Sequence, residues 1–261
     1  MKRVILGGMA LALTAGCATV PPAAEQHYYA RPAAAAGANP WVVILPGGGG
    51  MDVFGDEQFY FDVAKDWNAA GFDALVVHYQ AAAPLIAGVP QGAPGPMEAA
   101  VVADALAAAG RNGWLDLQCP GFAVGFSMGG AGALTLAANP PANLIGAVGF
   151  YPMVIGQPDA YQSQVPVLVL QGDEDELTTR PALDAFLAKV VQPERFTVRY
   201  YAGAQHGFDI PSLATPVEYN GGTFEYHPQA GPAAHDEAVM FRSAVLASAG
   251  APAECKTTQE D

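Results

Sequence analysis

The segment 125–129, GFSMG, has a G-x-S-x-G pattern, which is typical of a sharp turn from a strand into a helix. In such a turn the central residue, here Ser127, has a strained backbone, and its hydroxyl projects from the end of a sheet. The flanking glycines are needed because a Cβ there would collide with a neighbouring strand or helix. A Gly-rich turn without chemistry can show the same short pattern by chance. Ser127 is therefore a candidate nucleophile whose role depends on the residues around it.

His206 is the candidate base for this serine. A serine hydroxyl becomes an effective nucleophile when a histidine takes its proton and a carboxylate orients that histidine. His206 lies in AGAQHGF, directly after the last predicted strand, so we expect it at the same edge of the sheet as Ser127. It also follows the serine in the chain, as the order Ser, Asp, His requires. The alternative is a loop histidine that is hydrogen-bonded to the backbone.

The candidate acid lies in the acidic segment after the predicted strand VPVLVLQG. Asp175 stands three residues beyond Gly172, where a turn can bring its carboxylate back to the edge of the sheet. Asp173 is the alternative. The other acidic residues of this segment, Glu174 and Glu176, are expected to be solvated or to cap the following helix.

A serine that attacks a carbonyl carbon also requires hydrogen-bond donors for the oxyanion that forms on the carbonyl oxygen. The backbone N–H of Met128, directly after the serine, is one candidate. The second is expected from the glycine run in Pro46–Gly50, where the backbone can approach a substrate closely; Gly48 is the first choice and Gly49 the next. This loop does not match a phosphate-binding loop, because no Lys-Ser or Lys-Thr pair follows it. The chemistry needs no metal ion or cofactor.

Apolar strands alternate with helical segments along the chain, and this alternation predicts a mostly parallel, doubly wound sheet with helices on both faces. Besides the strand before Ser127, the predicted strands are Trp41–Leu45, Ala74–Val77, Leu144–Tyr151, Val165–Gly172 and Phe196–Tyr201. The predicted helices are Gln58–Ala70, Met97–Ala109, Met128–Asn139, Pro181–Val191 and Ala233–Ala249. The fold class is therefore α/β, in a single domain.

Composition limits the classes of partner. The chain has 261 residues, which is enough for one large domain with a buried core, and 51% of them are hydrophobic. It has 11 basic and 25 acidic residues, which give a formal net charge of −14. This balance disfavours nucleic acid and anionic membrane surfaces as partners.

Residues 1–17 resemble a bacterial signal peptide. Lys2 and Arg3 precede an apolar run that is too short for a permanent membrane span, and small residues follow it. The string LTAGC is similar to a lipobox, which predicts lipidation of Cys17, although Thr14 stands where leucine is usual. The alternatives are an ordinary signal peptide and a buried N-terminal helix. Both signal-peptide interpretations predict export to the bacterial periplasm or cell envelope, an oxidising compartment.

The Ala- and Pro-rich segment 18–37 is expected to be an exposed tether, in which His27–Arg31 could add a short edge strand. The folded domain is expected to span 38–250, and 251–261 is expected to be a polar tail. With Cys17 lipidated, Cys119 and Cys255 remain as a possible disulfide pair, although the sequence cannot show that they are close. The sequence contains no closely spaced Cys/His pairs, so it does not predict a zinc site.

With these residues in place, the chain from about Trp41 to Ala247 resembles the dienelactone hydrolase family of α/β hydrolases. The similar pieces are WVVILPGGGG, GFSMGGAGAL, AVGFYP, VPVLVLQGDEDELT and YYAGAQHGF. The resemblance implies an α/β-hydrolase fold and a catalytic triad of Ser127, Asp175 and His206.

The sequence departs from the founding members of that family at two points. They use a cysteine nucleophile where this chain has Ser127, and they carry a glutamate in the loop after the first matching strand. That loop is PGGGG here, and the first acidic residue is Asp52. The two changes fit together, since a serine nucleophile needs no group that activates a thiol. They favour a serine esterase of broader type over an enzyme for dienelactone itself.

The insertion Ile210–Pro232 directly follows His206 and is expected to form a flap over the site, since its aromatic residues are otherwise costly to expose; a simple surface loop is the alternative. Its aromatic and histidine residues are Tyr219, Phe224, Tyr226 and His227. Four further aromatic residues could line a pocket, although core packing is the more common role: Phe54, Phe59, Tyr60 and Tyr151.

Together these features predict an exported serine hydrolase that cleaves small carboxylic esters or lactones through an acyl-enzyme on Ser127. One alternative is a peptidase or a polysaccharide deacetylase on the same scaffold. The other is a non-catalytic binding protein of the cell envelope that has kept the fold.

Overall fold

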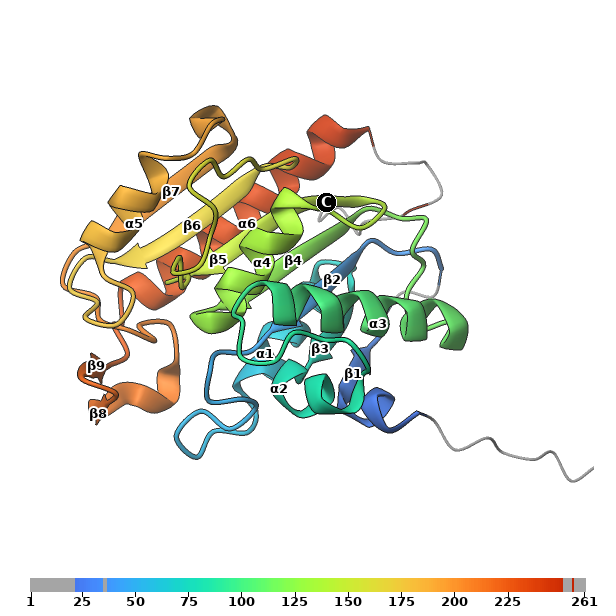
Figure 1. The fold of residues 1–261 in the computed structure, drawn as a ribbon, viewed down its shortest axis with the longest axis horizontal. Helices are drawn as coiled ribbons and strands as arrows, with labels where there is room; N and C mark the ends of the chain where they lie inside the picture. Colours follow the sequence, from blue (N-terminus) through green and yellow to red (C-terminus); the bar gives the residue numbers. More distant parts are fainter. Residues whose placement is uncertain (1–21, 35–36, 251–254, 256–261) are drawn as a thin grey trace, which may run out of the picture.

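The computed structural model describes residues 22–34, 37–250 and 255. Its main sheet has seven strands in the order β1-β3-β2-β4-β5-β6-β7, and all neighbours are parallel except the edge pair β1 and β3 (Figure 1). The strands are β1 Tyr28–Arg31, β2 Trp41–Leu45, β3 Asp73–Val77, β4 Gly121–Phe126, β5 Leu144–Phe150, β6 Val167–Gly172 and β7 Phe196–Tyr201. The predicted mostly parallel α/β sheet is confirmed.

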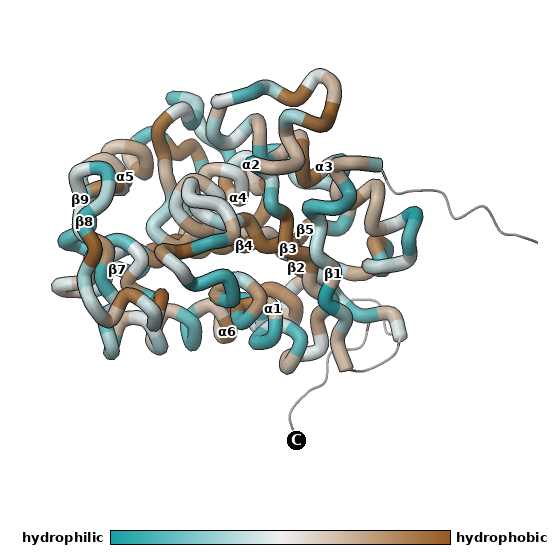
Figure 2. The backbone as a smooth tube through the Cα atoms, turned by 90° about the horizontal axis from the view of Figure 1, so that it is seen from below, coloured by the Kyte–Doolittle hydropathy of each residue, from teal (hydrophilic) through white to brown (hydrophobic). Residues whose placement is uncertain are grey.

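Helices cover both faces of this sheet, and the apolar strands form the layer between them (Figure 2). One face carries α1 Phe59–Ala69 and α6 Ala230–Ala249; the other carries α2 Tyr79–Ala82, α3 Pro96–Asn112, α4 Met128–Ala138 and α5 Arg180–Leu187. Every residue of β2, β3, β4 and β6 is buried. These strands are apolar without alternation because both of their faces pack against helices.

The folded domain begins before residue 38, so the predicted tether over 18–37 is wrong for part of its length. Ala23–His27 forms a 3-10 helix. The possible edge strand over His27–Arg31 is confirmed, because β1 pairs antiparallel with β3 at the edge of the sheet. The Tyr28 hydroxyl donates to Asp104 at 2.8 Å. The Ala- and Pro-rich composition concealed these contacts. The predicted signal peptide and Cys17 lie outside the described residues.

A disulfide joins Cys119 to Cys255, with the two Cα atoms 5.6 Å apart. Cys119 lies just before β4, and Cys255 also forms an isolated parallel bridge with Ala38. The possible pairing is therefore confirmed, and this residue of the predicted polar tail is fixed to the domain. Among the described helices, none is both long enough and apolar enough to cross a membrane.

Candidate active site

Ser127 lies on the turn between β4 and α4, and its φ and ψ of 53° and −115° are strained for a residue with a side chain. A Cβ on Gly125 would stand 2.1 Å from the carbonyl oxygen of Gly129, and one on Gly129 would stand 2.3 Å from that of Leu45. The two glycines are therefore required by close packing, as the pattern predicts. The tight turn leaves the Ser127 hydroxyl at the carboxyl edge of the sheet.

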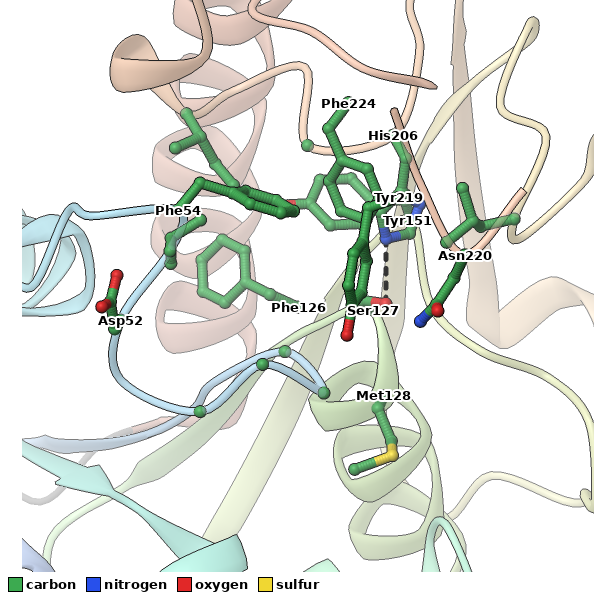
Figure 3. Close-up of a pocket in the computed structure, with 18 of the residues that line it drawn as sticks. Asp52, Phe54, Phe126, Ser127, Met128, Tyr151, His206, Tyr219, Asn220 and Phe224 are labelled. Atoms are coloured by element: carbon green, nitrogen blue, oxygen red, sulfur yellow. Dashed lines mark hydrogen bonds between the residues drawn. The ribbon is translucent and has the colours of Figure 1, made fainter. Parts of the chain in front are cut away.

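The three predicted triad residues form one chain of hydrogen bonds. His206 Nε2 lies 2.9 Å from Ser127 Oγ, and His206 Nδ1 lies 2.7 Å from Asp175 Oδ2 (Figure 3 shows the first contact). His206 follows β7 and Asp175 follows β6, so parallel strands bring all three residues to one edge. His206 is 1% exposed and Asp175 is 4% exposed, so water competes little for these contacts.

Asp175 is held in its ionised form by several donors. Its Oδ1 accepts hydrogen bonds from the backbone N–H groups of Leu177 and Thr178, at 2.8 and 2.9 Å, and its Oδ2 accepts one from the Thr178 hydroxyl at 2.8 Å. Burial alone would raise the pKa of Asp175, but the hydrogen bond and charge of His206 and the donors at Thr178 hold that pKa below its usual range. Asp173, the alternative acid, instead accepts from the backbone of Gly203. The geometry thus favours Asp175.

The glycine loop after β2 lies beside the first turn of α4. An added Cβ on Gly48 would stand 3.8 Å from the Cβ of Met128, whereas one on Gly49 would face the backbone of Asp52. The Gly47 N–H already donates to the Tyr60 hydroxyl at 2.8 Å. As the first residue of α4, Met128 has no intrahelical acceptor for its own N–H. The structure therefore brings the two predicted donors, Gly48 and Met128, next to each other.

A cavity of about 590 Å³ opens at Ser127 and His206. Phe54, Tyr60 and Tyr151 line this cavity, whereas Phe59 packs in the core, where its ring lies 5.4 Å from that of Phe126. Three of the four aromatic residues that the sequence offers as pocket candidates therefore line the cavity. Met128 also lines it.

The insertion after His206 contains a short hairpin, β8 Val217–Tyr219 and β9 Gly222–Phe224. Tyr219 and Phe224 line the cavity, so this part of the insertion borders the site, as a flap would; Tyr226 and His227 do not line it. Asn220 and Gly221 form the turn between the strands, with φ values of 53° and 82°. The Asn-Gly pair is a strong hairpin signal that the sequence interpretation missed.

A second group of polar residues behind the site also escaped the sequence interpretation. Asp209 is buried, and its carboxylate accepts from the Tyr151 hydroxyl at 2.8 Å and contacts His235 Nε2 at 3.2 Å. Burial tends to lower the pKa of His235, but the hydrogen bond and charge of Asp209 outweigh it, so the pKa is raised. No short motif links these residues, which come from three separate elements.

Among the described residues, no group of three or more His, Cys, Asp or Glu side chains has the arrangement of a metal site. The described site thus consists of a serine, a histidine, a carboxylate and backbone N–H groups beside an aromatic cavity.

Comparison with known proteins agrees with this fold. Residues 95–246 match the model of the dienelactone hydrolase family. Among solved structures, a dienelactone hydrolase-like promiscuous phosphotriesterase from metagenomic libraries is 22% identical, with a TM-score of 0.66 over 84% of this chain and 99% of that one. None of the curated proteins is similar enough to count as a match.

Two esterases share the fold at lower similarity. A carboxylesterase from Lactobacillus plantarum is 18% identical, with a TM-score of 0.55 over 84% of this chain and 92% of that one. A thermophilic esterase from Thermogutta terrifontis is 14% identical, with a TM-score of 0.56 over 85% and 87% of the two chains.

Proposed function

Since this chain belongs to the dienelactone hydrolase family, we propose that it is a serine hydrolase that cleaves carboxylic esters or lactones. The observation that carries this proposal is the hydrogen-bonded chain from Ser127 through His206 to Asp175, which opens onto an apolar cavity. A nucleophile, a base and an orienting acid in contact are the parts that acyl transfer requires.

In the first half of the reaction, Ser127 Oγ attacks the ester carbonyl carbon while His206 Nε2 takes the hydroxyl proton. The oxygen of the tetrahedral intermediate accepts hydrogen bonds from the N–H groups of Gly48 and Met128. When the intermediate collapses, the carbon–oxygen bond to the alcohol breaks, and His206 gives its proton to the departing alkoxide. The acyl group remains on Ser127.

In the second half, a water molecule attacks the acyl carbon while His206 again takes a proton. Collapse of the second intermediate releases the carboxylic acid and returns the proton to Ser127. Asp175 stays ionised throughout; it holds His206 Nδ1 protonated, so that Nε2 is free to act as the base. The donors at Leu177 and Thr178 favour this ionised form.

Hydrolysis of a panel of small esters tests this proposal. We expect the wild-type protein to hydrolyse them and Ser127→Ala to lower kcat/KM by about 10³-fold or more. Ser243→Ala, which removes an exposed hydroxyl on α6 that bonds only within that helix, is the matched control and should retain full activity. Equal activity of Ser127→Ala and wild type would contradict the proposal, as would hydrolysis confined to peptides or acylated polysaccharides.

We also propose that the protein is exported and lipid-anchored through Cys17. The signal-peptide-like residues 1–17 support export, and so does the disulfide between Cys119 and Cys255, since disulfides persist in oxidising compartments. Cys17→Ser should move the protein from the membrane fraction to the soluble fraction. An unchanged distribution would contradict the lipid anchor.

A further inference from the structure

We propose that Phe54, Tyr219 and Phe224 form an aromatic clamp that selects esters whose alcohol part is an uncharged aromatic group. This inference rests on the proposed ester hydrolysis at Ser127. It concerns the part of the cavity between the loop after β2 and the β8–β9 hairpin (Figure 3).

The three rings come from two segments that are far apart in the sequence: Phe54 from the loop after β2, and Tyr219 and Phe224 from the β8–β9 hairpin. The ring centroid of Phe54 lies 5.0 Å from that of Phe224 and 5.5 Å from that of Tyr219, and both contacts are edge-to-face. Phe54 is nevertheless 44% exposed and Tyr219 is 50% exposed, so their free faces border the cavity and solvent. An aromatic ring that enters the cavity can pack against these exposed faces.

The backbone at Phe54 indicates that its ring has a role beyond folding. Val53 and Asp56 exchange backbone hydrogen bonds at 2.9 and 3.1 Å, and between them Phe54 and Gly55 have positive φ values of 51° and 95°. This is the same two-residue turn that Asn220 and Gly221 make in the hairpin. Asn is favoured at the first turn position, whereas a bulky residue is strained there. Phe54 occupies the less favourable backbone and presents its ring to the cavity.

The clamp lies on the side of the site where the alcohol must leave. The ring of Phe224 is 4.8 Å from that of His206, and the backbone N–H of Glu225 donates to the His206 carbonyl at 3.2 Å. His206 gives its proton to the departing alcohol, so the alcohol part lies next to His206. Met128, which carries one of the expected oxyanion donors, lies away from the rings of Phe54 and Phe224 in Figure 3. The three rings therefore border the alcohol part of the ester.

The charges around the cavity oppose an anionic substrate. No lysine or arginine is among the described residues that line the cavity, and Asp52 is the carboxylate among them. Asp52 is fixed at the loop because its Oδ1 accepts from the Gly55 N–H at 2.5 Å. A carboxylate on the alcohol part would thus meet a like charge and find no cation to pair with.

Two pairs of matched acetate esters test the clamp. Benzyl acetate and cyclohexylmethyl acetate differ in the aromaticity of an otherwise similar ring, and we expect kcat/KM to be about three- to tenfold higher for the benzyl ester. The esters of 4-carbamoylbenzyl and 4-carboxybenzyl alcohol differ in charge, and we expect at least about a tenfold preference for the uncharged one.

Phe54→Asn is the informative variant, because it removes the ring and supplies the residue that the turn prefers. We expect it to abolish the preference for the benzyl ester while the Tm stays the same or rises. Asp52→Asn should narrow the difference in kcat/KM between the charged and the uncharged ester. Val191→Asn, which removes an exposed apolar side chain that does not line the cavity, should change neither preference.

Absence of both preferences in the wild-type protein would overturn the clamp while leaving ester hydrolysis at Ser127 in place. A lower Tm with an equal loss of rate on all esters in Phe54→Asn would also overturn it, since Phe54 would then be structural. No hydrolysis of any ester, with Ser127→Ala and wild type indistinguishable, would overturn the proposed function together with the clamp.

Discussion

The hydroxyl of Tyr151 donates a hydrogen bond to the buried carboxylate of Asp209, and the two oxygens are 2.8 Å apart. The ring of the same tyrosine lies 4.6 Å from the imidazole of His206. Tyr151 directly follows β5 and has a φ of 38°, an unusual value for a residue with a side chain. Burial raises its pKa, so the phenol stays protonated and remains a donor. Asp209 therefore fixes the ring against which His206 packs.

Tyr151→Phe tests this support. The substitution keeps the ring but leaves the buried carboxylate of Asp209 with His235 as its remaining side-chain partner. We expect the free energy of unfolding to fall by about 1–3 kcal/mol, since a buried acceptor loses its donor. Chemical denaturation measures the change. Tyr29→Phe is a matched control, and an equal effect of the two variants would contradict the role of the Tyr151 hydroxyl.

Asp175→Asn is expected to lower kcat by about 10³- to 10⁴-fold, because the amide does not hold His206 in the tautomer that leaves Nε2 free. Asp173→Asn is the control two residues away; this side chain contacts the backbone of Gly203 and should leave kcat within about twofold. Steady-state hydrolysis of a small ester measures both variants. The assignment of the acid would be wrong if Asp173→Asn caused the larger loss.

Glu98 gives the stability a dependence on pH. It is fully buried, and its Oε2 accepts from the Gly95 N–H at 2.6 Å, at the start of α3. Burial raises the pKa of Glu98 from 4.5 to about 7, although its backbone hydrogen bonds partly oppose the shift. The folded state then binds this proton more tightly than the unfolded state does. The free energy of unfolding should therefore decrease as pH rises from about 4.5 to about 7.

Denaturant unfolding at about pH 5 and pH 6.5 measures this slope, because most of the loss of the same sign that the raised pKa of His235 adds comes above this range. In the wild-type protein we expect the free energy of unfolding to decrease by about 1–2 kcal/mol between these two pH values. Glu98→Gln keeps an acceptor for Gly95 and should remove most of the decrease. A slope that persists in this variant would assign the titration to another group.

The disulfide should contribute strongly to stability, since Cys119 and Cys255 are separated by 136 residues. We expect Cys255→Ser to lower the free energy of unfolding by about 2–4 kcal/mol. A reducing agent should lower the Tm of the wild-type protein but not that of Cys255→Ser. Equal sensitivity of the two proteins to reduction would contradict the assignment.

The sequence was sufficient to predict the sheet and the residues at its carboxyl edge. Long apolar strands that end in loops determine which residues meet there, and Ser127, Asp175 and His206 each follow a different strand. The choice between Asp173 and Asp175 needed the structure. Both follow β6 within three residues, and only the path of the turn decides which carboxylate reaches His206.

Other features depended on contacts that have no local pattern. The start of the domain was misplaced because Ala- and Pro-rich composition suggests a tether, whereas pairing with β3 fixes Tyr28–Arg31 in the sheet. The contact of Asp209 with Tyr151 and His235 joins elements that only the fold brings together. The position of Phe54 in a strained turn was equally hidden, since its sequence context does not favour such a turn.

Covalent labelling with a fluorophosphonate shows whether Ser127 is the nucleophile, because this reagent reacts with an activated serine hydroxyl. Intact-mass measurement should show one adduct per wild-type molecule, and peptide mapping should place it on Ser127. Ser127→Ala should show no adduct, and His206→Ala should react far more slowly because Ser127 then lacks its base. An unlabelled wild-type protein, or equal labelling of Ser127→Ala, would show that Ser127 is not an activated nucleophile.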